Sequence, residues 1–325
     1  MENKSYEEKE VFIKGQYRLA GTLAIPKGEG KKLPAVLIIP GSGQIDRDGY
    51  VENMKFHTNL YKDLAHIVTA SGFVSMRVDK RGVGKSQGDF FETGMWDLVE
   101  DIEKSIDFLK EQPSVDPNEI ILLGHSEGCM LAAAVNARKP VDGLILLSGA
   151  AETLEEALKR QREILVEEAK NKNKVNGFLL RLLKADKKVD KQADKFMNKI
   201  IHSNKTMMRY NFSKVNAKWF REHHYYNVLE DLKRVNCPVL ALTGDKDFQA
   251  DHSKLGRLPD LIRGDLEYYS IKDMNHGLKK QEGPMSALNF KKEYKEKAKD
   301  PIHSEVVERL ALWLNKYFDA TKKTQ

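Results

Sequence analysis

The chain has 325 residues, of which 41% are hydrophobic and 31% charged, and its formal net charge is +6 at pH 7. This length suits one large domain with an insertion, and the apolar content is sufficient for a buried core. No apolar run approaches the roughly 20 residues of a membrane span, and the charged residues 1–10 lack the apolar segment of a secretory signal. We therefore expect a soluble, cytoplasmic protein.

The two cysteines are not placed as a disulfide framework. Cys129 falls in a predicted helix and Cys237 lies just before a predicted strand, so both are expected to be buried thiols. No Cys/His spacing indicates a metal site, and no cofactor is predicted.

Apolar runs alternate with amphipathic segments along the chain and predict an α/β fold. Strands are expected at 11–25 (as a pair around a turn), 35–39, 73–78, 120–123, 143–147, 239–243 and 266–271. Helices are expected at 60–70, 98–109, 129–137 and 304–318. Several strands are apolar throughout, which predicts a mostly parallel sheet with helices on both faces.

One long segment interrupts this alternation. About 90 residues without a strand-like run separate the strands at 143–147 and 239–243, too many for an unstructured loop. Helical spacing is found at Leu154, Ala157, Leu158, Leu165 and residues 178–183. We therefore expect a core of residues 1–150 and 235–325, with a helical cap over 151–234.

The cap segment is basic, with 20 Lys or Arg against 12 Asp or Glu. Solvated helix faces are the expected explanation, although attraction of an anionic substrate such as acyl-CoA is an alternative. A basic stretch without a recognised module does not indicate nucleic acid binding. The segment also contains aromatic residues that are expected mostly to form the cap's own core, with pocket lining as the alternative, namely Trp219, Phe220, Tyr225 and Tyr226. Its histidines His223 and His224 are expected to be surface or structural residues, with substrate contact as the alternative.

The most informative motif is Gly-x-Ser-x-Gly, which lies between an apolar strand and a helix. In this context the motif presents a nucleophilic serine at the tip of a strained turn. Gly124 and Gly128 are needed where side chains would collide with the neighbouring strand and helix. We interpret Ser126 as the nucleophile, and a glycine-rich turn with a solvated serine is the alternative.

A serine nucleophile needs a base, and the base needs an orienting carboxylate. His276 follows the last predicted strand, precedes a glycine and is interpreted as the base. Asp247 is the preferred acid because it lies beyond the glycine that ends its strand. Asp245 is its rival but is expected to bond turn amides; Asp251 and Asp273 are weaker candidates.

Two backbone N–H groups are expected to stabilise a developing oxyanion. The N–H of Glu127 lies at the start of the helix that follows the nucleophile. A second donor is expected from the glycine-containing loop at 40–44. The Ser42 N–H is favoured there, with Gln44 as its rival.

Two further motifs receive structural interpretations. Gly-Val-Gly-Lys-Ser at 82–86 resembles part of a phosphate loop, but Asp79 stands where the pattern requires its first glycine, so nucleotide binding is not predicted. Asp79 and Arg81 are expected to shape a loop at the rim of the sheet. The charged cluster at 46–48 is expected to form salt links, with recognition of a charged substrate end as the alternative.

Together these motifs resemble the α/β-hydrolase family, in the branch of bacterial esterases and lipases with a serine aminopeptidase or monoacylglycerol-lipase-like domain. The resemblance rests on residues 40–49, 79–86, 124–128, 237–247 and 275–276 and on the terminal helix. It implies an eight-stranded, mostly parallel sheet and a Ser126-Asp247-His276 triad with Ser42 and Glu127 amides as the oxyanion hole. Pro40 departs from the family pattern, because many relatives carry histidine before the glycine.

The expected function is hydrolysis of carboxylic esters with short to medium acyl chains, through an acyl-enzyme on Ser126. A small-molecule ester is then the expected partner. Thioesters and peptides are alternative substrates of the same chemistry. A non-catalytic binding or scaffold protein with this fold, or one that recruits an acidic partner through the cap, is the alternative of another class.

Overall fold

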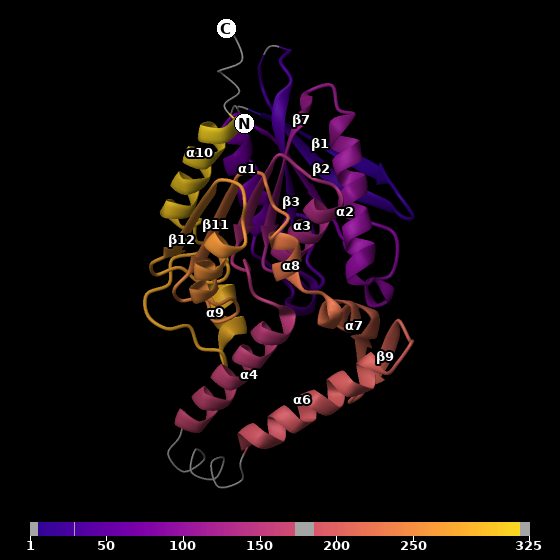
Figure 1. Cartoon of the computed structure of the whole chain (residues 1–325), viewed down its shortest axis with the longest axis vertical. Coiled ribbons are helices and arrows are strands. Elements are labelled where there is room, and N and C mark those ends of the chain that lie inside the picture. Colours follow the sequence, from indigo (N-terminus) through magenta and orange to yellow (C-terminus); the bar gives the residue numbers. More distant parts are fainter. Residues whose placement is uncertain (1–5, 29, 173–184, 319–325) are drawn as a thin grey trace.

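The computed structural model describes residues 6–28, 30–172 and 185–318. An eight-stranded sheet forms its centre (Figure 1), in the order β1-β2-β6-β3-β7-β8-β11-β12. The eight strands are β1 (Tyr6–Lys14), β2 (Arg18–Pro26), β3 (Leu33–Ile39), β6 (Val74–Val78), β7 (Val115–His125), β8 (Gly143–Leu147), β11 (Val239–Gly244) and β12 (Leu266–Ile271). Only the β1–β2 and β2–β6 pairs are antiparallel, which confirms the mostly parallel sheet.

Helices cover both faces of this sheet, as the apolar strands predicted. One face packs on α2 (Met95–Lys110), α3 (Glu127–Arg138) and α8 (Val228–Leu232). The other packs on α1 (Leu60–Ala70) and α10 (Ser304–Phe318). Successive residues of β3 alternate between the two cores, because side chains of a strand point to opposite faces in turn.

Several short elements lie outside the predicted helices and strands. A two-stranded hairpin pairs β4 (Tyr50–Val51) with β5 (Phe56–His57) around the 3-10 turn η1 (Glu52–Met54). The 3-10 segments η2 (Phe90–Glu92) and η3 (His252–Asp260) and helix α9 (Phe290–Lys297) complete this group. All are too short for an apolar period to be recognised in the sequence.

The segment between β8 and β11 contains more than helices. It comprises α4 (Leu154–Asn171), α6 (Ala185–Ile201), β9 (Met207–Tyr210), β10 (Ser213–Asn216), α7 (Ala217–Tyr225) and then α8. The β9–β10 hairpin corrects the expectation of a segment without strands. Its four-residue strands are mixed in polarity, and its turn residues Asn211 and Phe212 adopt positive φ without a glycine to mark them.

Helix α4 begins with a capping box, in which Thr153 and Glu156 bond each other's backbone N–H groups. Helices α4 and α6 extend beyond the sheet and together form a V, whose point lies away from the sheet (Figure 1). The helical spacing at 178–183 lies outside the described residues. Within the part of the chain that is described, no helix combines the length and apolar character needed to cross a membrane.

Candidate active site

Ser126 occupies a strained turn between β7 and α3. Its φ of 56° and ψ of −120° place a non-glycine residue in a conformation that costs free energy and is found mainly at functional sites. The turn is fixed from both sides, because Ser126 N–H donates to Leu147 O at 2.9 Å and Ser126 O accepts from Cys129 N–H at 3.0 Å. The sharp strand-to-helix turn that the motif predicted is therefore present.

Three glycines allow the backbone to close around this serine. A Cβ on Gly124 would overlap the backbone of Gly128, and one on Gly128 would overlap Ile39 O. A Cβ on Gly149 would overlap the carbonyl of Ser126 itself. The first two glycines were predicted from the motif. Gly149, which follows β8, was missed, because only the three-dimensional neighbourhood of β7 and β8 explains it.

The loops after β11 and β12 bring Asp247 and His276 together. His276 Nδ1 lies 2.8 Å from Asp247 Oδ2. The other carboxylate oxygen, Asp247 Oδ1, accepts from the N–H groups of Gln249 and Ala250 at 2.8 and 2.9 Å. Both oxygens of this buried carboxylate are therefore bonded, which fixes its orientation.

The rival carboxylates make other contacts. Asp245 accepts from Asp273 N–H at 2.7 Å and from Lys246 Nζ at 2.8 Å, so it ties the ends of β11 and β12 together. Asp245 was expected to bond amides of its own turn, but its partner Asp273 is 28 residues away in the sequence. Asp251 accepts from Ser253 N–H at 2.9 Å at the start of η3. The structure thus pairs His276 with Asp247 alone among the four candidates.

Ser126, His276 and Ser42 all border one cavity of about 260 Å³. Gly41 packs so closely on Ser126 that a Cβ at position 41 would lie 3.1 Å from Ser126 Cβ. The loop expected to provide an oxyanion donor therefore lies beside Ser126. Gln44 lies further along it, where its carbonyl accepts from Glu52 N–H at 3.0 Å.

A chain of buried hydrogen bonds joins the Gly41 loop to the histidine loop. Gly41 N–H donates to Tyr61 Oη at 2.8 Å, Tyr61 Oη lies 3.2 Å from His125 Nδ1, and His125 Nε2 lies 2.8 Å from His276 O. One proton arrangement fits: Tyr61 donates to Nδ1, and Nε2–H donates to the carbonyl. Burial, together with the nearby His276, lowers the pKa of His125 to about 3, so this ring stays neutral.

A second buried group surrounds the carboxylate of Glu127. Trp219 Nε1 donates to its Oε1, and His223 Nε2 lies 3.1 Å from the same atom. Lys80 Nζ donates to Gly41 O at 2.6 Å and lies 3.9 Å from Glu127 Oε2. Burial alone would raise the pKa of the Glu127 carboxyl, but hydrogen bonds from His223 and Trp219 and the charge of Lys80 lower it.

This group accounts for two buried residues, His223 and Lys80. His223 is buried between Trp219 and Glu127, so it contacts the start of α3, in agreement with the structural role expected for it. Lys80, in the loop after β6, was not singled out at all. The Asp-Lys-Arg-Gly run could have indicated it, because this run places a lysine at the carboxyl end of β6, which pairs with β3.

The other charged motifs are structural. Arg47 pairs with Asp79 at 3.3 Å and with Glu10 at 2.7 Å, and Asp48 pairs with Arg77 at 2.6 Å. The glycine-containing turn at 82–86 packs against the Asp79 carboxylate, which accepts from Lys85 N–H at 3.0 Å. These contacts match the salt-linked loop predicted for the cluster at 46–48.

The cysteines form no disulfide. Cys129 is buried in α3, as expected, whereas Cys237 is only half-buried. Across the described ranges, which omit 1–5, 29, 173–184 and 319–325, no group of three or more His, Cys, Asp or Glu side chains could hold a metal ion.

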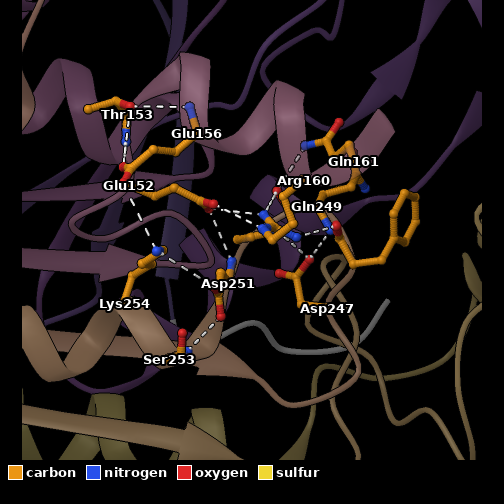
Figure 2. A network of polar contacts seen from close by, with 12 residues as sticks. Glu152, Thr153, Glu156, Arg160, Gln161, Asp247, Gln249, Asp251, Ser253 and Lys254 are labelled. Atoms are coloured by element: carbon orange, nitrogen blue, oxygen red, sulfur yellow. Dashed lines mark hydrogen bonds and ion pairs between the residues drawn. The ribbon is translucent and has the colours of Figure 1, made fainter. Parts of the chain in front are cut away.

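Helix α4 is fixed to the loop that carries Asp247 (Figure 2). Arg160 donates to the carbonyls of Phe248 and Gln249 at 2.6 and 2.7 Å and forms a two-pronged pair with Glu152. Glu152 also accepts from Asp251 N–H at 3.1 Å. The guanidinium therefore joins the first turns of α4 to the loop that carries Asp247, in a geometry that a lysine could not reproduce.

We expect Arg160→Met to lower the free energy of unfolding by about 2 kcal/mol, because it removes the charged donor that bonds the buried Glu152 carboxylate and the carbonyls of Phe248 and Gln249. Urea denaturation followed by circular dichroism measures the change. Lys159→Met, at an exposed position of the same helix, is the matched control and should stay within about 0.5 kcal/mol of the wild type. Equal effects of the two substitutions would contradict the anchoring role.

A smaller cavity of about 160 Å³ also borders Ser126 and is lined in part by α4 and α7. The residues from these two helices that line it are Leu154, Ala157, Leu158, Gln161, Trp219 and Phe220. Tyr225 and Tyr226 face elsewhere, beside Trp96. Of the four aromatic residues for which pocket lining was the alternative to a place in the cap's own core, Trp219 and Phe220 thus line this cavity with Ser126, and Tyr225 and Tyr226 do not.

The fold and the strained serine define a class of protein: an α/β-hydrolase. Solved structures of this kind share the architecture. Est1E from Butyrivibrio proteoclasticus with bound ferulic acid matches with a TM-score of 0.58 and 18% identity over 93% of this chain and 99% of that one. An esterase from Pyrococcus furiosus matches with a TM-score of 0.57 and 14% identity over 97% and 93% of the two chains.

Sequence comparison narrows this class to a family. Residues 51–282 match the model of the serine aminopeptidase family S33, and the chain belongs to that family. Esterase EstD of Thermotoga maritima is 26% identical over 315 residues, which is 96% of this chain and 68% of that protein. The chain is thus an esterase-like serine hydrolase.

Proposed function

We propose that this protein hydrolyses carboxylic esters through an acyl-enzyme formed on Ser126, with His276 as the base and Asp247 as its orienting acid. The observation that carries the proposal is the 2.8 Å contact between His276 Nδ1 and Asp247 Oδ2, at a cavity that Ser126 also borders. With Nδ1–H held by the carboxylate, Nε2 is left free to accept the serine proton. The similarity to two esterases supports the choice of ester substrates.

The reaction follows from these positions. Ser126 Oγ attacks the ester carbonyl while His276 takes its proton, and the oxyanion is stabilised by backbone N–H groups. Glu127 N–H, at the start of α3, is the first proposed donor, and Ser42 N–H is the second. His276 then protonates the leaving alcohol and afterwards activates the water that releases the acid. None of these steps requires a cofactor.

We assign the segment 151–234 as a cap on a core of residues 1–150 and 235–325. Its helices α4 and α7 wall the smaller cavity beside Ser126, and the Arg160 contacts hold α4 on the acid loop. The volumes of about 260 and 160 Å³ of the two cavities that border Ser126 favour substrates with short to medium chains.

Covalent labelling tests the proposal and separates it from a non-catalytic binding protein. A fluorophosphonate probe is expected to label the wild type on the peptide that contains Ser126, as read by mass spectrometry, and to leave Ser126→Ala unlabelled. In parallel, p-nitrophenyl esters from acetate to laurate are expected to show an optimum at short to medium chains. A folded wild type that neither labels nor hydrolyses any of these esters would overturn the proposal and favour a binding role.

A further inference from the structure

Ser42 borders both of the cavities that Ser126 borders. The β4–β5 hairpin and α9 wall the larger cavity, and α4 and α7 line part of the smaller one. Ser42 N–H finds no hydrogen-bond acceptor among the described residues. This N–H is therefore available to a developing oxyanion, but it has no partner of its own that would fix its direction.

The direction of Ser42 N–H is set through the other end of its peptide group. The peptide bond between Gly41 and Ser42 is trans, so Gly41 C=O and Ser42 N–H point in nearly opposite directions. Lys80 Nζ donates to Gly41 O at 2.6 Å. Ser42 lines both cavities, whereas Lys80 is not one of the described residues that line them. A carbonyl held by Lys80 therefore leaves Ser42 N–H on the side that faces away from the lysine.

The backbone of Gly41 depends on its hydrogen bonds for a fixed orientation. Glycine tolerates a wide range of backbone angles, so this peptide group could rotate at little cost if nothing held it. Tyr61 Oη accepts from Gly41 N–H at 2.8 Å, and Lys80 binds the Gly41 carbonyl. A residue with a side chain would crowd Ser126, since its Cβ would lie 3.1 Å from Ser126 Cβ. Tyr61 and Lys80 thus supply the restraint that a glycine lacks.

A buried partner helps Lys80 to keep its charge. Lys80 Nζ lies 3.9 Å from Glu127 Oε2, and both side chains are buried. Burial lowers the pKa of the Lys80 ammonium, an effect that the Glu127 carboxylate opposes. Trp219 and His223 of α7 contact the same carboxylate. The cap therefore holds the counter-ion of this lysine in place.

Stability alone does not account for this arrangement. A buried ion pair often adds no more stability than apolar side chains of the same shape. The one hydrogen bond that Lys80 Nζ makes with the described residues goes to Gly41 O and not to Glu127. A cation on a peptide carbonyl also polarises the peptide group, which makes its N–H a stronger donor. Both the direction and the strength of the Ser42 N–H donor thus depend on Lys80.

We propose that Lys80 is a positioning residue of the oxyanion hole, which holds the Gly41 carbonyl and so directs Ser42 N–H at the oxyanion of the substrate. Lys80 itself touches no substrate atom and takes part in no proton transfer. This inference rests on the proposed function and adds to it a residue outside the triad.

Lys80→Met tests this role, because methionine keeps most of the length of the side chain and lacks the charged donor. We expect kcat/KM for p-nitrophenyl butyrate to fall roughly ten- to a hundredfold, because Ser42 N–H is still present but no longer held in position. Lys85→Met is the matched control. Lys85 lies in the same loop, but its side chain is exposed and pairs with Glu10. This control should keep kcat/KM within about twofold of the wild type.

A pair of ketones separates positioning from a general loss of structure. Ser126 Oγ adds to the carbonyl carbon of butyl trifluoromethyl ketone, the serine proton passes to His276, and the carbonyl oxygen becomes an oxyanion in the hole. Butyl methyl ketone has the same chain but a less electrophilic carbonyl, so it reports binding without the adduct. In Lys80→Met the inhibition constant of the trifluoromethyl ketone should rise by the factor by which kcat/KM falls, and that of the methyl ketone should stay within about twofold. A lower kcat/KM without weaker inhibition by the trifluoromethyl ketone would overturn the proposal.

The double variant Lys80→Met/Glu127→Gln excludes a second explanation. Lys80→Met alone leaves the buried Glu127 carboxylate without its cation, whereas the double variant removes both charges. We expect the double variant to show the same loss as Lys80→Met, and it provides the comparison if Lys80→Met fails to fold. Recovery of the wild-type kcat/KM in the double variant would assign the loss to the unpaired carboxylate and overturn the proposal. An unchanged kcat/KM in Lys80→Met would overturn this inference alone, whereas a folded wild type that hydrolyses no ester would overturn the proposed function.

Discussion

Ser126→Ala is expected to lower kcat for p-nitrophenyl butyrate by about four to six orders of magnitude, with little change in KM. The substitution removes the only atom that the mechanism uses to form the acyl-enzyme, while both cavities and the His276–Asp247 pair remain. Alanine at this position adopts the same positive φ as the serine, so the backbone strain is unchanged. Steady-state kinetics with purified wild type and variant measure the loss.

Ser42→Ala is the matched control for this experiment. Ser42 borders the same two cavities, but the mechanism uses its backbone N–H and not its hydroxyl. The kcat of Ser42→Ala should therefore stay within about tenfold of the wild type. The variant retains the backbone donor, and one such donor stabilises the transition state by roughly 3 kcal/mol. A Ser126→Ala protein that keeps a tenth of the wild-type rate would exclude this serine as the nucleophile.

Asp247→Asn is expected to lower kcat by about four orders of magnitude near neutral pH. Asparagine is nearly isosteric, but its amide can donate to His276 Nδ1 where the carboxylate accepts. The ring proton would then move to Nε2, and the base could no longer take the serine proton. The measurement is kcat for p-nitrophenyl butyrate, with thermal unfolding to verify that the variant is folded.

Asp245→Asn distinguishes the two rival carboxylates. Asp245 accepts from Asp273 N–H and from Lys246 and does not contact His276. Its substitution should change kcat by less than about tenfold and act mainly on stability. A larger loss for Asp245→Asn than for Asp247→Asn would reverse the assignment of the acid.

Most of the sheet could be predicted because its strands are apolar throughout and its helices have a clear period. The expected bounds of the helix at 60–70 and of the strands at 143–147 and 266–271 agree with α1, β8 and β12. The strand-turn-helix pattern around Ser126 also predicted the strained turn. These features depend on neighbours in the sequence or on one repeated pattern of burial.

The features that could not be predicted depend on contacts between residues far apart in the chain. Arg160 meets carbonyls 88 and 89 residues away, and Tyr61 reaches His125 across 64 residues. No local pattern marks either side chain. The larger cavity was likewise missed, because the hairpin and α9 that wall it are each too short to show a period.

The buried hydrogen-bond chain from Gly41 to His276 has a consequence for the tolerance of the fold to acid. His125 has an ordinary pKa of 6.5 in the unfolded chain but one of about 3 in the folded protein. Between these two values the unfolded chain binds a proton at this residue that the folded protein does not. The free energy of unfolding therefore falls as the pH drops below 6.5 and stops falling on this account near pH 3. The burial of His125 between Tyr61 and His276 thus makes proton uptake at His125 a cause of acid unfolding.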